Sequence, residues 1–223
     1  MFPLKDRNPT RRIPIVTISL IVLNVVVFLY QLSLGRDLEQ FFERFGAVPQ
    51  SIMSCMSPME FLPGVLLPMT TSMFLHGGWL HLIGNMLYLW VFGDNVEDKL
   101  GRPQFVVFYL LCGIIASGLH IVIDPTSSVP MVGASGAISG VLGAYLLMFP
   151  GARVVTVIPI FVFLQVAELP ALVVLGFWFV IQFFNGMLSL GYEAGGLGGV
   201  AWWAHIGGFV AGVILVLPFR RFR

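Results

Sequence analysis

The most regular feature of the sequence is a series of long apolar stretches separated by polar or charged segments. A helix that crosses a bilayer needs about 20 mostly apolar residues. The six expected spans, in chain order, are Ile13–Leu34, Trp79–Phe92, Phe105–Ile123, Ser135–Phe149, Leu169–Phe184 and Ala201–Phe219. The pattern therefore predicts an all-α membrane protein with six transmembrane helices.

The later part of the chain departs from this regular pattern. The fourth expected span is short, so it crosses a bilayer only if its start lies below the membrane surface. The stretch Val154–Phe184 is apolar but is interrupted by Pro159, Gln165, Glu168 and Pro170. We therefore expect an interfacial segment here, followed by the fifth span.

Two connections differ from simple linkers. The segment Gly35–Gly78 is long and mixes apolar with charged residues, and long loops are often functional. We expect short amphipathic helices in it that lie partly in the outer leaflet. The connection Asn185–Val200 is rich in glycine and is expected to be mobile.

Composition and charge agree with a membrane location and predict an orientation. Hydrophobic residues make up 57% of the chain and charged residues only 10%, which excludes the water-soluble classes. Of the 12 lysines and arginines, all except Arg36 and Arg44 fall on the side of the expected bundle that carries both termini. The positive-inside rule therefore predicts a cell-membrane protein with cytoplasmic termini. Its parts are a cytoplasmic segment at 1–12, a six-span domain at 13–219 and a cytoplasmic end at 220–223.

Polar side chains inside the expected spans are few, and they are candidates for function because polar groups are costly in lipid. They are His81 and Asn85 in the second span, Ser135 and Ser139 in the fourth and His205 in the sixth, with His76 just before the second. No carboxylate lies well inside a span, so any serine-histidine chemistry would use a dyad. The His-Glu-x-x-His motif of zinc proteases is missing, and we expect neither a metal ion nor a cofactor.

Ser135 lies where a loop turns into a helix, within the small-residue run Gly133–Ala137. That position exposes a hydroxyl group. It also directs the unpaired amides and positive dipole of the helix start toward an oxyanion on a carbonyl that Ser135 attacks. The alternative is a serine that caps the helix or hydrogen-bonds a neighbouring helix.

His205 is the candidate general base, because histidine titrates in the useful range and a serine hydroxyl needs a base to take its proton. Small residues allow the fourth and sixth spans to pack closely around this pair. They are Gly136 and Gly140 on one side and Ala204, Gly208 and Gly212 on the other. The alternative is an outer-interface histidine beside the aromatic belt of Trp202 and Trp203.

His81 and Asn85 are four residues apart and so share one face of the second span. Their N–H groups could join the Ser135 amide in holding an oxyanion. The alternative is hydrogen bonding between helices, which would by itself explain Asn85. His76 lies at the outer boundary, where a histidine costs little.

Four segments together resemble the rhomboid family of intramembrane serine proteases, and the resemblance covers nearly the whole chain. They are Gly133–Gly136, Ala204–Gly208, His81–Asn85 and Gly93–Gly101. The resemblance implies a compact six-span bundle, a half-embedded first loop, and lateral admission of substrate by the fifth span and the loop after it. It also implies that the substrates are single-span membrane proteins with helix-destabilising residues near the cut.

The resemblance further implies roles for individual residues. Ser135 and His205 would form the catalytic dyad of a serine endopeptidase, while Asn85 and His81 would help to stabilise the oxyanion. Some members carry an aromatic residue four positions after the nucleophile that stacks on the base. This chain has Ser139 there, so another aromatic residue could take that place.

Two other functions are compatible with parts of the pattern. A non-catalytic relative could bind membrane-protein clients in the same groove, although inactive relatives usually lose the serine or the histidine. A small transporter or channel would also place polar groups inside the membrane. Internal repeats and intramembrane carboxylates, which are typical of transporters, are not found in the sequence.

Overall fold

The computed structural model describes the chain from residue 1 to 219 except residues 56, 58, 60, 161–162 and 191–199. The helices are α1 (Ile15–Ser33), α2 (Leu38–Phe45), α3 (Pro49–Met53), α5 (Leu67–Thr71), α6 (Trp79–Leu100), α7 (Arg102–Ile123), α8 (Ser135–Met148), α9 (Ala171–Ser189) and α10 (Trp202–Val216). The strands are β1 (Phe2–Asp6), β2 (Arg153–Ile160) and β3 (Phe163–Pro170). Short 3₁₀ or π-helical turns lie at Gly35–Asp37, Phe61–Leu66, Ser72–Phe74 and Leu217–Phe219.

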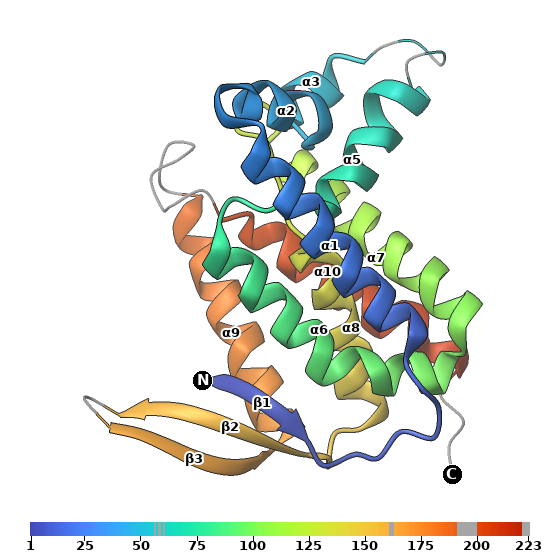
Figure 1. Cartoon of the computed structure of the whole chain (residues 1–223), viewed down its shortest axis with the longest axis vertical. Helices are drawn as coiled ribbons and strands as arrows, with labels where there is room; N and C mark the ends of the chain where they lie inside the picture. Colours follow the sequence, from blue (N-terminus) through green and yellow to red (C-terminus); the bar gives the residue numbers. More distant parts are fainter. Residues whose placement is uncertain (56, 58, 60, 161–162, 191–199, 220–223) are drawn as a thin grey trace.

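Helix α8 lies inside a bundle of long helices and packs against α6, α7 and α10 (Figure 1). All of its residues from Ala137 to Tyr145 are buried. A helix that is apolar or small on every face is stable only when it is surrounded in this way. Ser135 is the first residue of this central helix, so neighbouring helices supply its surroundings.

Small residues bring α8 and α10 into close contact, as the sequence predicted for the fourth and sixth spans. A Cβ atom on Gly208 would overlap the carbonyl oxygen of Gly136, and one on Gly212 would overlap that of Gly140. The predicted packing of these two helices is confirmed. It fixes the distance between Ser135 on α8 and His205 on α10.

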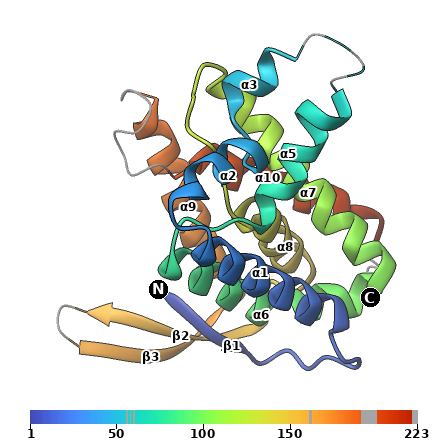
Figure 2. The same cartoon turned by 45° about the horizontal axis from the view of Figure 1, so that its top comes forward.

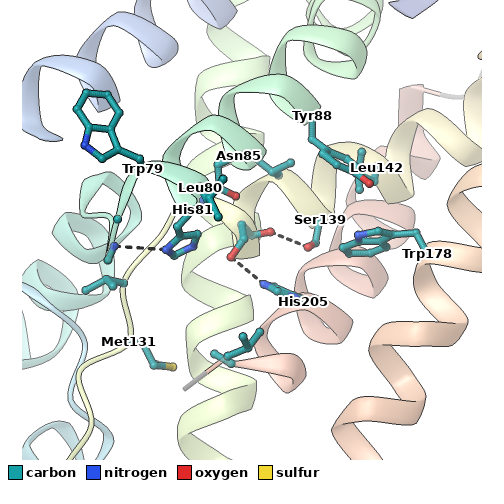
Figure 3. A pocket seen from close by; sticks show the side chains of 18 of the residues that line it. Trp79, Leu80, His81, Asn85, Tyr88, Met131, Ser139, Leu142, Trp178 and His205 are labelled. Carbon is teal, nitrogen blue, oxygen red and sulfur yellow. Dashed lines mark hydrogen bonds between the residues drawn. The ribbon is translucent and has the colours of Figure 1, made fainter. Parts of the chain in front are cut away.

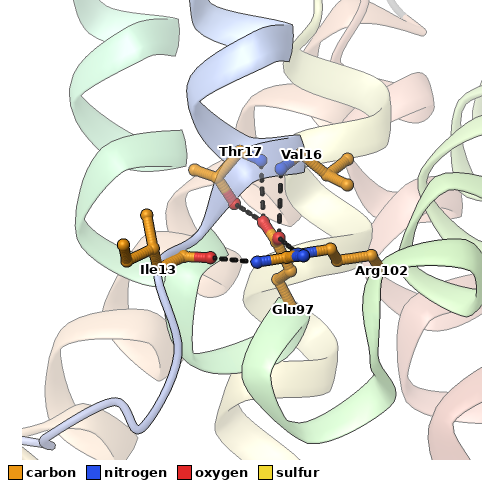
Figure 4. A network of polar contacts seen from close by, with 5 residues as sticks. All are labelled: Ile13, Val16, Thr17, Glu97 and Arg102. Atoms are coloured by element: carbon orange, nitrogen blue, oxygen red, sulfur yellow. Dashed lines mark hydrogen bonds and ion pairs between the residues drawn. The ribbon is translucent and has the colours of Figure 1, made fainter.

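Helix α6 is longer than the sequence interpretation allowed, which ended the second span at Phe92. The helix continues through its charged end because the polar side chains there have partners in other elements. The Glu97 carboxylate accepts hydrogen bonds from the Val16 and Thr17 amides at 3.0 and 2.7 Å and from the Thr17 hydroxyl at 2.8 Å (Figure 4). The helix ends at Gly101, whose φ of 84° favours glycine.

A three-stranded antiparallel sheet corrects the all-α prediction. The expected interfacial segment is the hairpin β2–β3, in which Val154 pairs with Leu169, and the N-terminal strand β1 pairs with β2. The β-branched residues of β2 favour a strand, and the interruptions that we took as helix breaks are compatible with one. The structure is therefore mostly helical, with a sheet at one end of the bundle (Figure 1).

The segment 35–78 contains the short helices that the sequence predicted, namely α2, α3 and α5. Figure 2 shows them gathered at the end of the molecule opposite the sheet. Their position in the outer leaflet stays a prediction. The glycine-rich connection Asn185–Val200 was expected to be mobile, but most of it, residues 191–199, lies outside the described residues.

Length and composition indicate a membrane protein. Four of the described helices are long and apolar enough to cross a bilayer, namely α1, α7, α9 and α10 with the turn that follows it. Helix α8 is apolar but shorter, and α6 is long but carries His81, Asn85 and its charged end. Exposed apolar side chains such as Val26 on α1 and Val180 on α9 form surface that suits lipid.

Candidate active site

The turn before α8 presents Ser135 and depends on a glycine. Gly133 has a φ of 126°, a conformation that L side chains rarely adopt. A Cβ atom at this position would lie 2.7 Å from the ring of His81. The Gly133 amide donates a hydrogen bond to the Ser72 carbonyl at 2.9 Å, which anchors the turn to the segment 35–78. Only glycine therefore fits at position 133, and the turn that it forms sets the position of Ser135.

His205 faces Ser135 from the first turn of α10. The distance between His205 Nε2 and Ser135 Oγ is 2.8 Å (Figure 3). With a proton on Nδ1, the Nε2 lone pair accepts the hydrogen bond that the serine hydroxyl donates. This is the geometry by which a general base activates a hydroxyl nucleophile.

Aromatic and amide side chains surround the other edge of His205. The Gln182 Oε1 atom lies 2.7 Å from His205 Nδ1 and accepts the hydrogen bond that this nitrogen donates. The Trp178 ring centroid is 6.0 Å from that of His205, and the Trp202 centroid is 6.1 Å from it. Ser139, where an aromatic stacks in some relatives, instead donates a hydrogen bond to the Ser135 carbonyl at 2.6 Å.

His81 and Asn85 lie on the face of α6 that borders the same site. His81 Nδ1 accepts a hydrogen bond from the Gly77 amide at 3.4 Å. The buried Asn85 Nδ2 atom has no hydrogen-bond partner among the described residues. A buried amide donor without a partner is costly, so this N–H group is available to a bound oxygen atom.

His76 lies just before α6, as the sequence placed it just before the second span, and its side chain is buried. Its side chain is 1% exposed, and its ring makes an edge contact with His81 at a centroid distance of 5.1 Å. Burial, together with the nearby His81, lowers the pKa of His76 to about 4. His76 is therefore a neutral packing partner behind His81.

Ser135 and His205 line a cavity of about 840 Å³. Four of its polar lining residues are the predicted ones, namely His81, Asn85, Ser135 and His205. Its other walls include the apolar side chains of Met131, Leu142 and Trp178 (Figure 3). In the part of the chain that the structure describes, no three His, Cys, Asp or Glu side chains are grouped to hold a metal ion.

Comparison with known proteins assigns the family. The Rhomboid domain model matches residues 63–222, which is more than half of the chain. The chain belongs to the rhomboid family. It is 31% identical to Rhomboid protease GluP of Bacillus subtilis (strain 168) over 210 residues, covering 92% of this chain and 36% of that protein.

Mitochondrial members of the rhomboid family match a shorter part of the chain. Presenilin-associated rhomboid-like protein A of Danio rerio is 36% identical over 112 residues, covering 49% of this chain and 29% of that protein. The corresponding Mus musculus protein is 35% identical over 109 residues, with 48% and 29% covered. The chain thus spans 29 to 36% of the length of these curated relatives.

Two polar residues near the rhomboid site, Gln182 and His120, were not among those predicted from the sequence. Gln182 on α9 contacts His205, and His120 on α7 is close enough to interact with it electrostatically. Both lie inside expected spans, so the rule that selected His81 and Asn85 also selects them. Their partners could not be read from the sequence, because each belongs to a different helix from the one that it contacts.

Proposed function

We propose that this rhomboid-family chain is an intramembrane serine endopeptidase that cleaves transmembrane-segment peptide bonds of single-span membrane proteins. The observation that carries this proposal is the 2.8 Å contact between His205 Nε2 and Ser135 Oγ inside a cavity lined by several helices. The relative named Rhomboid protease GluP adds support, since it aligns with 92% of this chain.

In the proposed first step, His205 Nε2 takes the hydroxyl proton while Ser135 Oγ attacks the carbonyl carbon of the substrate. The resulting tetrahedral intermediate collapses when the imidazolium gives its proton to the leaving amine, which leaves an acyl ester on Ser135. Water then attacks the ester with His205 again as base. The acid product is released, the Ser135 hydroxyl is regenerated, and the proton returns to its starting position.

The start of α8 and the free amide of Asn85 support the proposed oxyanion site. The first hydrogen bond of α8 runs from the Ile138 amide to the Ala134 carbonyl, and no side chain caps the helix. The amides of its first turn, including that of Ser135, precede that bond and point toward the cavity end of the helix. Together with Asn85 Nδ2 and His81, they can hold the developing negative charge.

The proposed arrangement in the membrane uses six spans within residues 13–219. Helices α6 and α8 join the four long apolar helices as spans, because the bundle surrounds the polar groups of α6 and the short α8. The basic residues support cytoplasmic termini in a cell membrane, with segments 1–12 and 220–223 on that side. The active site would then open to the outer side, next to a half-embedded segment 35–78.

A cleavage assay tests the proposed function. The purified chain is reconstituted in liposomes with a tagged single-span substrate, and Ser135→Ala and His205→Ala are compared with the parent. We expect each variant to lose at least about 10³-fold in rate, as nucleophile and base variants of serine proteases do. Ser19→Ala on the exposed face of α1 is the matched control and should cleave like the parent.

Two results would contradict the proposal. Parent-like cleavage by either variant would remove that residue from the mechanism. Binding of the substrate by a folded parent, without turnover of any single-span substrate tested, would instead favour the non-catalytic client-binding function.

A further inference from the structure

Gln182 is a buried polar residue on a helix whose outer surface suits lipid. Its side chain is 7% exposed, while Val180 and Phe184 on the same helix are 60% and 65% exposed. The other buried residues of α9 are apolar or small: Ala171, Val174, Leu175 and Gly186. A glutamine on this packed stripe is costly in a membrane unless its amide is paired.

The partner of Gln182 is the proposed base. Its Oε1 atom lies 2.7 Å from His205 Nδ1, and His205 Nε2 lies 2.8 Å from Ser135 Oγ. An amide can present either its oxygen or its NH₂ group to the ring. Only the oxygen keeps the proton on Nδ1 and leaves the Nε2 lone pair free to take the serine proton. The Gln182 amide therefore selects the tautomer that a base requires.

The groups around His205 explain why an amide, rather than a carboxylate, accepts the Nδ1 hydrogen bond. The titratable groups that act on His205 are His81 of α6 and His120 of α7, and no carboxylate of the described residues is among them. A buried carboxylate beside a neutral imidazole would be left unpaired at a high cost in this medium. An amide oxygen accepts the Nδ1 hydrogen bond without a charge, and its dipole still favours the imidazolium that forms during the reaction.

We propose that Gln182 is the positioning residue for His205 and that, through it, the packing of α9 controls the orientation of the base. This inference rests on the proposed serine protease function. Gln182 and Trp178 both contact His205 from α9, and Figure 3 shows Trp178 beside His205. Ring contacts join α9 to α10, such as Phe179 with Phe209 at a centroid distance of 4.7 Å. A shift of α9 by about 1 Å away from α10 breaks a hydrogen bond of this length.

The test compares Gln182→Met and Gln182→Glu with the parent in liposomes. Methionine keeps the length and fills the space but offers no comparable acceptor, so we expect kcat to fall about 10- to 100-fold with KM unchanged. Glutamate keeps an oxygen at the same reach, so we expect it to restore most of kcat and to move the acid limb of the pH–rate profile to higher pH. Phe183→Leu, an exposed position on the same helix, is the control and should match the parent.

The outcomes separate this inference from the proposed function. An active parent with an equally active Gln182→Met overturns the positioning role and leaves the dyad in place. A parent that neither cleaves substrate nor reacts with a serine probe overturns both. If Gln182→Met does not fold, Gln182→Glu decides, because an acid limb at the parent's pH would overturn the contact with Nδ1.

Discussion

At the residue scale, the site depends on positions where the surrounding atoms leave no room for a larger side chain. Gly133 illustrates this, because both its φ of 126° and the ring of His81 exclude a larger residue. The same turn carries Ser135 two positions later. A small displacement of a nucleophile lowers the reaction rate strongly. Gly133 is therefore part of the site although it has no reactive group.

We predict that Gly133→Ala reduces reaction with a fluorophosphonate serine probe by about 10²-fold, because the added Cβ displaces the turn or the His81 ring. Gly176→Ala on α9 is the matched control, since a Cβ there meets no atom within 4 Å. The measurement is the labelling rate of purified protein in detergent. Equal rates for Gly133→Ala and the parent would show that the turn tolerates a side chain.

His76 makes the stability of the folded protein depend on pH. Its folded pKa is lowered from 6.5 to about 4 by burial and by His81, so the folded protein prefers the neutral ring. The stability that this preference contributes is fully present above pH 6.5 and is lost as the pH falls through about 4. We predict that the Tm of the parent falls more steeply between pH 6.5 and 4 than that of His76→Phe. Parallel curves would contradict this.

The candidate dyad could be predicted from the sequence, but its support could not. Ser135 and His205 occur in runs of small residues, which predict close helix packing and expose both side chains. Gln182 is a single glutamine in an apolar stretch, and its partner follows 23 positions later on another helix. Sequence periodicity marks which residues share a helix face, but it does not say which faces meet.

At the element scale, Glu97 joins two helices that are far apart in the sequence. It lies on α6, yet its carboxylate accepts hydrogen bonds from the first amides of α1, whose own N-cap, Pro14, offers no side-chain hydrogen bond. In the same region, the Arg102 guanidinium donates a hydrogen bond to the Ile13 carbonyl at 3.3 Å (Figure 4). The start of α1 is therefore capped by another helix.

We predict that Glu97→Gln destabilises the fold by about 1–3 kcal/mol, because one carboxylate oxygen becomes an NH₂ group facing amide donors. Glu39→Gln makes the same change of charge at an exposed position of α2 and should unfold like the parent. Thermal unfolding in detergent measures both. A Tm for Glu97→Gln equal to that of the Glu39 control would contradict the capping role.

Two elements were predicted wrongly from the sequence, namely the end of α6 and the sheet. The end of α6 was predicted too early because its charged residues resemble a loop, whereas Glu97 is hydrogen-bonded to α1 and Asn95 is hydrogen-bonded to β1. Strand β1 was missed because its partner β2 is far along the chain, as in the pairing of Phe2 with Val157. The hairpin β2–β3 is local, and it was missed because its prolines and polar residues were taken as helix breaks.

At the scale of the whole molecule, the two ends of the bundle differ in their structure. The sheet and the charged end of α6 lie at one end, and the short helices of segment 35–78 lie at the other (Figure 1). The basic residues gather toward the sheet end, as in Lys5, Arg7 and Arg153. Positive charge on one side is the signal that predicts which end faces the cytoplasm.

We predict that a membrane-impermeant maleimide labels Arg36→Cys in intact cells but labels Lys99→Cys only after permeabilisation. The background for both carries Cys55→Ser, and Cys112 is buried. The unmodified background is the control for labelling of Cys112. Labelling of Lys99→Cys in intact cells, with Arg36→Cys protected, would reverse the proposed orientation.

Labelling by a fluorophosphonate probe tests whether His205 activates Ser135. The purified parent, Ser135→Ala and His205→Ala are treated with the probe, and the modified peptide is identified by mass spectrometry. We expect a single adduct on Ser135 of the parent and none in either variant. A folded parent that never reacts, or an adduct of equal rate in His205→Ala, would contradict it.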